Sequence, residues 1–182
     1  MSPNQNRNLS DRLIRIIESD AKELTKSTVQ KLQLSPQTES YHNLPYSELY
    51  NRCYEVYRDF GRWLWQKPNA IQAWYNELGE KRWEEGIPLA EVLWALVLTK
   101  DRLTEYLDAC GLVDSAMELY QQQEFYRMVG HFFDRAICYT AVGYERRACE
   151  QGKSSADGRK LRLSRTLWPQ PGLFRGVHHR HS

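Results

Sequence analysis

GIPLAEVLWALVLTKDRLTEYLDACG, residues 86–111, is the stretch of sequence that decides the predicted fold. Gly86 can end one helix, and Pro88 suits the first turn of the next, because that turn leaves its amide hydrogens without helical partners. Apolar residues then recur at steps of three and four: Leu89, Val92, Leu93, Leu96, Leu103 and Leu107. This period predicts an amphipathic helix that starts near Leu89 and ends at Gly111.

Two further helices are predicted on the N-terminal side of this stretch. We expect a flexible leader over residues 1–9, followed by a helix over about 10–32 with Ser10 as its N-cap. A second periodic segment covers about 45–66 and has a proline at its first turn. Cys53 falls on the apolar face of this segment, so we expect it to be a small buried hydrophobe. Gly61 lies within this segment and indicates close packing or a bend.

The remaining helices are predicted on either side of the deciding stretch. One covers about 69–86, and the other continues the helical period over about 116–144. Because the second span is much longer than the average globular helix of about 10–14 residues, we expect a kink or break near 121–123. The residues of the 69–86 helix that we expect to face inward are Ile71, Trp74 and Leu78.

The pattern as a whole predicts an all-α fold. No segment alternates apolar and polar residues for long enough to indicate a β-sheet. We therefore expect one helical domain over residues 10–150, with five or six helices joined by short connections. Either a bundle or a globin-like arrangement would bury the apolar faces of these helices. The composition, 41% hydrophobic and 26% charged, is ordinary for a single globular domain.

Residues 151–182 differ in kind from the rest of the chain. They are rich in Gly, Pro, Ser and Arg and have no sustained period, so we expect a disordered or non-native basic tail. From Lys153 onward, seven Lys and Arg residues face one acid, Asp157, so the formal net charge of +2 comes from this tail and the body is mildly acidic. A mildly acidic body argues against a nucleic-acid-binding face.

The motifs of catalysis, metal binding and membrane insertion are missing from the sequence. It has no GxSxG elbow, no Gly-rich phosphate loop and no CxxC pair among its four cysteines. No run approaches the roughly 18 apolar residues of a membrane span, and the N-terminus has no apolar signal-peptide core. We therefore predict a non-enzyme without cofactor or native metal site, in the cytoplasm with free thiols. The tail histidines, for which we expect only adventitious metal binding, are His178, His179 and His181.

Aromatic side chains crowd into the predicted second to fourth helices. Tyr54, Trp63 and Trp83 are candidates for a ligand pocket wall or a partner surface, and the alternative that they cover the bundle stays open. His131 lies in an apolar segment, where a haem ligand can sit in helical haem proteins. The other interpretation is a histidine at the edge of the core. We therefore keep haem or small-ligand sensing through His131 as a minor alternative.

Four short stretches together resemble a known family. They are LGEKR at 78–82, EGIPLAEVLWAL at 85–96, FFDRA at 132–136 and GYE at 143–145. This combination resembles the RsbRD-type N-terminal domain of the RsbT co-antagonist family, over about residues 10–147. The resemblance implies an all-helical input domain of a bacterial stress or signalling regulator, with no catalytic residue to carry over. Related RsbR input domains are globin-like without haem.

The resemblance also implies partners. We expect a non-catalytic sensory domain that binds protein partners in a signalling complex, forms a homodimer or responds to a small ligand. In this family an output domain such as a STAS module usually follows. This sequence departs from that pattern after residue 150, so we expect an isolated sensor, a truncated product or a fragment. The alternative function is a helical protein-interaction scaffold.

The matching positions around the deciding stretch define a helix corner. Gly86 is expected to end the helix before the corner and Pro88 to start the helix after it. Arg82 and Glu91 are expected to pair across the corner and fix the angle between the two helices. An exposed pair of this kind contributes only ~0–1 kcal/mol.

Overall fold

The computed structural model describes residues 3–111 and 115–155, and every regular element within these ranges is helical. The predicted all-α class is therefore confirmed. No helix in the described ranges is long and apolar enough to cross a lipid bilayer. The elements are α1 (Pro3–Ser19), α2 (Ala21–Leu34), the 3-10 helix η1 (Glu39–Tyr41), α3 (Tyr46–Arg58), α4 (Phe60–Trp65), α5 (Pro68–Glu84), α6 (Leu89–Ala109) and α7 (Ala116–Ser155).

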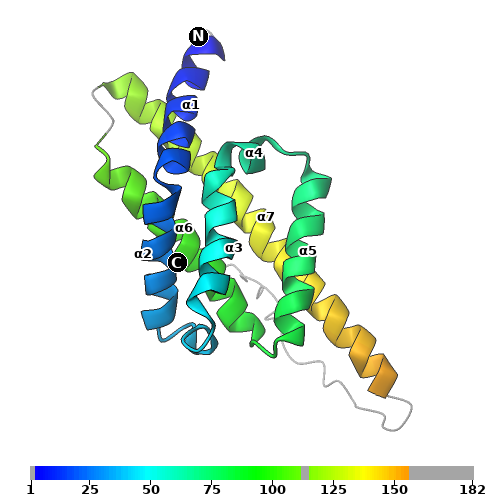
Figure 1. Ribbon diagram of the computed structural model, residues 1–182. Coiled ribbons are helices and arrows are strands. Elements are labelled where there is room, and N and C mark those ends of the chain that lie inside the picture. Colours follow the sequence, from blue (N-terminus) through cyan, green and yellow to red (C-terminus); the bar gives the residue numbers. More distant parts are fainter. Residues whose placement is uncertain (1–2, 112–114, 156–182) are drawn as a thin grey trace, which may run out of the picture.

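The longest helix, α7, crosses the molecule from one end to the other (Figure 1). α5 packs along it in the most extensive contact between any two helices, and α6 and α1 also pack against it. α2 lies beside α3 and also contacts α6. The arrangement is one helical bundle organised around α7, and a globin-like topology stays a prediction.

Two segments that the sequence predicts as single helices are each broken in two. The 10–32 segment breaks at Asp20, whose carboxylate accepts a hydrogen bond from the Tyr106 hydroxyl on α6. The 45–66 segment breaks at Asp59. Aspartate is a weak helix former, because its short side chain competes for hydrogen bonds near the backbone. The described ranges therefore contain seven α-helices rather than five or six.

The predicted break in the last helix is wrong. Gln121 is buried, and Phe125, one turn later, is completely buried. Inward packing therefore continues through the segment where we expected a kink, and glutamine is itself a good helix former. α7 accordingly runs without a break from Ala116 to Ser155.

The ends of the domain also differ from expectation. α1 begins at Pro3, so it extends into the predicted 1–9 leader, and Ser10 lies inside the helix instead of capping it. At the other end, α7 continues to Ser155, so the helix includes the first residues of the predicted basic tail. The rest of that tail, residues 156–182, lies outside the described residues.

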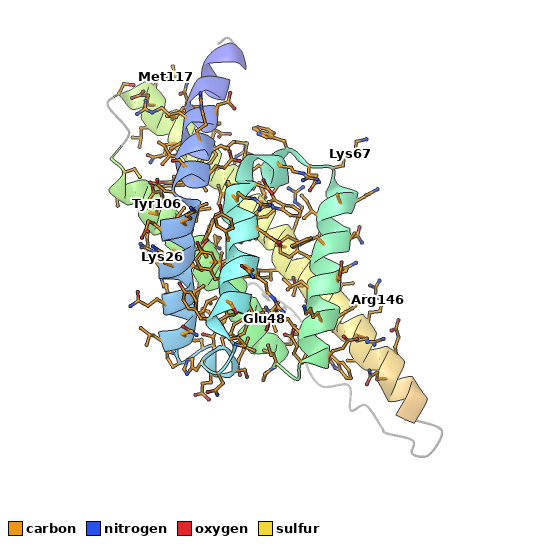
Figure 2. The ribbon with its side chains drawn as sticks, in the orientation of Figure 1. Lys26, Glu48, Lys67, Tyr106, Met117 and Arg146 are labelled. Carbon is orange, nitrogen blue, oxygen red and sulfur yellow. The ribbon has the colours of Figure 1, made fainter. Side chains whose placement is uncertain are left out.

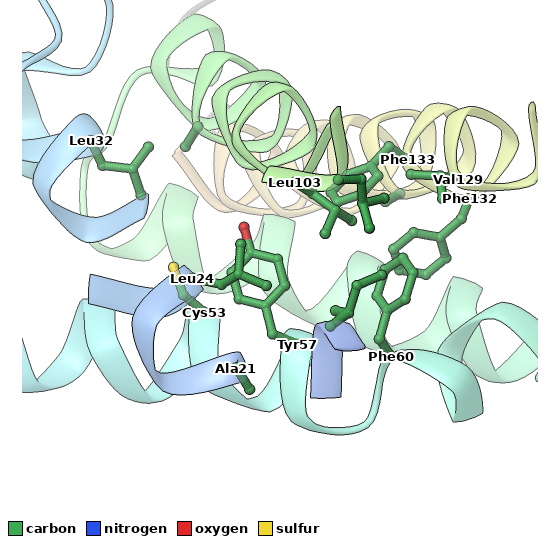
Figure 3. Packing of buried hydrophobic residues seen from close by; sticks show 14 of the residues in the cluster. Ala21, Leu24, Leu32, Cys53, Tyr57, Phe60, Leu103, Val129, Phe132 and Phe133 are labelled. Carbon is green, nitrogen blue, oxygen red and sulfur yellow. The ribbon is translucent and has the colours of Figure 1, made fainter. Parts of the chain in front are cut away.

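An aromatic cluster fixes α7 against α4 and α5. The Phe132 ring is edge-to-face with the rings of Phe60 and Tyr75, with centroids 5.9 Å apart in each case. Phe133 lies 5.1 Å from Phe132, again edge-to-face (Figure 3). All four rings are buried. Pairs in this geometry contribute about 0.5–1.5 kcal/mol beyond the apolar area that they bury.

Tyr57 connects three helices through one buried hydroxyl. Its oxygen lies 2.8 Å from the Thr28 hydroxyl on α2 and donates to the Thr99 carbonyl oxygen on α6 at 3.2 Å. Burial raises the pKa of Tyr57, so the phenol stays neutral. A buried hydroxyl that makes both bonds specifies how α2, α3 and α6 fit together.

Gly61 marks close packing, as the sequence indicates. A Cβ placed there would lie 2.7 Å from Cγ2 of Ile14 on α1. The Gly61 amide also donates to the Glu18 carboxylate at 2.9 Å. The missing side chain therefore lets α4 approach α1.

An even closer approach than that at Gly61 occurs where α5 and α7 cross, which we call the glycine crossing (Gly79, Gly143, Asn76 and Thr140). A Cβ at Gly79 would overlap the backbone carbonyl oxygen of Thr140, and a Cβ at Gly143 would overlap that of Asn76. In both cases the obstacle is backbone, which cannot turn away as the end of a flexible side chain can. Only glycine at both positions allows this separation of the two helices.

We predict that Gly79→Ala lowers the free energy of unfolding by about 3 kcal/mol, because the added methyl group forces α5 and α7 apart. The matched control is Gly130→Ala, also inside a helix, where a Cβ would meet nothing within 4 Å. That control is expected to gain about 0.5–1 kcal/mol from helix propensity. Urea unfolding followed by circular dichroism measures both. Equal effects of the two substitutions would contradict the close crossing.

Candidate functional site

A cavity of about 100 Å³ lies in the core beside the glycine crossing. An engineered apolar cavity of about 150 Å³ in another protein binds benzene, so this volume suits a compact small molecule. The walls come from α2, η1, α3, α5, α6 and α7. The lining residues are Leu32, Tyr41, Leu49, Arg52, Cys53, Val56, Trp74, Tyr75, Leu78, Arg82, Val92, Ala95, Leu96, Thr99 and Phe133.

Two arginines form the charged part of this mostly apolar lining. Arg52 on α3 pairs with Glu48 on the same helix (labelled in Figure 2) and with Glu85 beyond the end of α5, the latter at 2.9 Å. Arg82 on α5 also pairs with Glu85, and its side chain is only 4% exposed. Its guanidinium carbon lies 5.4 Å from the centre of the Tyr41 ring, a cation–π distance. Two guanidinium groups therefore face two carboxylates, and the cluster is electrically balanced.

One donor of this cluster has no hydrogen-bond partner among the described residues. It is Nη1 of Arg52, a buried atom. Leaving a buried donor unpaired costs about 1–3 kcal/mol, and more when the donor is charged. The cavity lining therefore includes a residue, Arg52, with an unpaired hydrogen-bond donor.

The other polar groups of the lining stay neutral. Burial raises the pKa of the Cys53 thiol to about 12, so its reactive thiolate is scarce at neutral pH. Burial likewise raises the pKa of Tyr41 and of Tyr75. The prediction that Cys53 is a small buried hydrophobe agrees with this position. None of these three groups is poised to transfer a proton at neutral pH.

Trp74 separates the cavity from the surface. It lines the cavity on one side and, on the other, an open groove that also contains Trp63 and Arg58. The rings of Trp63 and Trp74 are 5.1 Å apart. The prediction that Trp74 faces inward is wrong in part, because 37% of the residue is exposed. Because Trp74 lines both spaces, we expect its side chain to limit access to the cavity from the groove.

The four predicted surface residues do not meet in one site. Tyr54 stacks on Tyr50 at 5.8 Å and lies under the Arg58 guanidinium. Trp63 borders the groove next to Trp74. Trp83 lines a different groove beside the end of α7, and His131 is exposed in a third, between α4 and α7. None of the four lines the core cavity, so His131 is not directed at that apolar space.

Two of the four predicted corner residues take the expected positions. Gly86 follows the end of α5 with φ +73°, which favours glycine, and Pro88 directly precedes α6. The Tyr144 hydroxyl on α7 donates to the Ile87 carbonyl oxygen at 2.9 Å and holds the corner against α7.

The predicted Arg82–Glu91 pair is wrong. Arg82 reaches Glu85, one turn along the chain. Glu91 instead accepts hydrogen bonds from the Ser40 amide at 2.7 Å and from its hydroxyl at 3.1 Å. The η1 segment approaches the start of α6, so the Glu91 carboxylate binds the Ser40 amide instead of the predicted partner Arg82.

Sequence reasoning missed Arg52 entirely. Glu48 and Arg52 are four residues apart, a spacing that normally indicates an exposed pair on a helix surface. The only further signal is that Arg52 directly precedes Cys53, which lies on the predicted apolar face. Clusters of three or more His, Cys, Asp or Glu that could hold a metal do not occur among residues 3–111 and 115–155.

We predict that a small thiol reagent such as methyl methanethiosulfonate modifies Cys53 on the order of 100-fold more slowly than exposed Cys149, because its thiolate is scarce and shielded. Trp74→Ala is expected to raise the Cys53 rate about tenfold by opening the cavity, without changing the Cys149 rate. Peptide mass spectrometry resolves the two sites.

The matched control is Trp94→Ala, because Trp94 is exposed on α6 and does not line the cavity. A Cys53 rate that rises equally in both variants would contradict the role of Trp74. Equal rates at Cys53 and Cys149 in the unmodified protein would contradict the burial of Cys53 in the cavity lining.

No family model, curated protein or solved structure matches the chain.

Proposed function

We propose that the chain is a non-catalytic regulatory input domain of a bacterial signalling protein, of the kind that its sequence resembles. In this proposal the packing around the core cavity sets the position of α7, and α7 passes that state to a partner protein. A cytoplasmic location and binding to other signalling proteins or to a second copy of the chain belong to the same proposal.

The observation that carries the proposal is the position, in the structure, of the four stretches that resemble the RsbRD-type domain. Gly79 and Gly143 come from two stretches far apart in the sequence, and they meet at the glycine crossing. Tyr144, next to Gly143, donates to Ile87 at the corner. Phe133, from the third stretch, lines the cavity. The four stretches thus converge on the junction of α5, α6 and α7, which supports a shared mechanical role.

The form of α7 suits transmission of a signal. Within one unbroken helix, Phe133 lines the cavity, Gly143 lies at the crossing, and the C-terminal turns extend past the end of α5 (Figure 1). A helix that slides or rotates at the crossing moves its projecting end with it. A ligand that binds one arrangement of α7 more tightly than the other would increase the population of the arrangement that it favours.

The ion pairs that hold α7 to α5 beyond the glycine crossing are weak enough to change. Arg146, labelled in Figure 2, pairs with Glu80, and Arg147 pairs with Glu84; the four side chains are between 32% and 52% exposed. Exposed pairs contribute only ~0–1 kcal/mol each. These pairs can therefore exchange partners when α7 shifts, and the aromatic cluster keeps the middle of the helix in place.

We predict that filling the cavity alters the dynamics of α7 at and beyond the glycine crossing. Ala95→Leu, at a buried position in the lining, should change amide hydrogen exchange over residues 141–150 about tenfold more than over 121–130. Hydrogen-exchange mass spectrometry of the full chain measures both segments.

Ala90→Leu is the matched control, because Ala90 lies on the same helix but is exposed and outside the cavity lining. It should leave both segments unchanged. A uniform change along α7 would indicate simple destabilisation, and no change over 141–150 would refute coupling between the cavity and the helix end.

A further inference from the structure

We propose that the core cavity binds a small, neutral, largely apolar molecule with one hydrogen-bond acceptor, such as a compact ketone, and that Arg52 donates to that acceptor. This inference rests on the proposed function, because it names the class of signal that the input domain would detect.

The size and walls of the cavity set the apolar character of the ligand. The volume of about 100 Å³ is smaller than the benzene-binding cavity of about 150 Å³, so roughly four non-hydrogen atoms fit inside, and a slightly larger ligand extends into the open mouth of the cavity. Apolar side chains such as Leu49, Val92 and Phe133, from three different helices, make up most of the lining. Such a site gains affinity from buried apolar surface and uses few polar groups to orient the ligand.

Arg52 sets the single polar contact. Its Nη2 is already engaged by Glu48 and Glu85, whereas its buried Nη1 has no partner. Arg82, the other guanidinium in the lining, is engaged by Glu85. A ligand oxygen that accepts from Nη1 would satisfy a donor that the folded chain leaves unpaired, which is a strong source of selectivity over an alkane of the same shape.

The charge balance sets the neutrality of the ligand. The positive charges of Arg52 and Arg82 are already matched by the carboxylates of Glu48 and Glu85. A carboxylate ligand would add an unmatched negative charge to a mostly apolar lining, and an ammonium ligand would find the carboxylates of Glu48 and Glu85 already paired with arginine. Burial of an unmatched charge is costly, so a neutral acceptor is favoured over either ion.

The test is a titration of the full ¹⁵N-labelled chain with three probes of similar size, followed by NMR. Cyclopentanone offers a carbonyl oxygen, cyclopentane lacks it, and isobutyrate carries a negative charge. We expect cyclopentanone to bind about tenfold more tightly than either of the others, with shifts centred on Cys53 and Ala95. Tighter binding of isobutyrate, equal binding of cyclopentane, or shifts centred elsewhere would each overturn the proposal.

Variants separate the donor from the cavity. Arg52→Met keeps an apolar stem and should abolish the preference for cyclopentanone over cyclopentane, whereas Ala95→Leu should abolish binding of both. Ala90→Leu, outside the lining, should bind like the unmodified protein. If Arg52→Met fails to fold, the three-probe comparison in the unmodified chain still decides the outcome.

Failure of this proposal can be told apart from failure of the proposed function. Absence of probe binding would reject the ligand class. The hydrogen-exchange response of α7 to Ala95→Leu uses no ligand, so it tests the coupling of cavity and helix independently.

Discussion

The separation of α5 and α7 at the glycine crossing is the constraint on which the rest of the structure depends. Gly79 and Gly143 each face backbone of the other helix, so neither helix can carry a side chain there. This close approach brings Tyr75 and Phe132 into edge-to-face contact and places Tyr144 within reach of the corner at Ile87. Helices that approach through small residues gain extensive van der Waals contact between their backbones. The position of α7 therefore follows from two missing side chains.

The cavity and the crossing are parts of one arrangement. Phe133 and Leu78 line the cavity from the two helices that cross. Leu78 directly precedes Gly79, and Phe133 lies about three turns before Gly143 on the same unbroken helix. Any molecule that occupies the cavity would press on the same helix pair. A tightly packed crossing has few intermediate states, so a small change in the cavity favours a discrete shift of the part of α7 from the crossing onward. This coupling is the physical basis for proposing a regulatory rather than a chemical role.

Apolar periodicity was sufficient to predict the all-α fold, and local signals placed α6 between Pro88 and Gly111. It could not reveal the breaks at Asp20 and Asp59, because the apolar period continues across both and no proline marks them. It also missed the cavity. Arg52 has the spacing of a surface ion pair, and its role depends on Glu85, which is distant in sequence. Packing between helices decides which charged side chains are buried, and that information is not local.

The most direct test of this account is a nuclear Overhauser measurement on the full chain in solution. The account predicts cross-peaks between the Hα protons of Gly79 and the amide proton of Tyr144, because a Cβ at Gly79 would lie 2.7 Å from that nitrogen. It also predicts cross-peaks between the Hα protons of Gly143 and Hα of Asn76, by the same geometry. Both sets together would establish that α5 and α7 meet backbone to backbone. Their absence in a well-resolved spectrum, with contacts only between side chains of the two helices, would contradict the crossing and the coupling built on it.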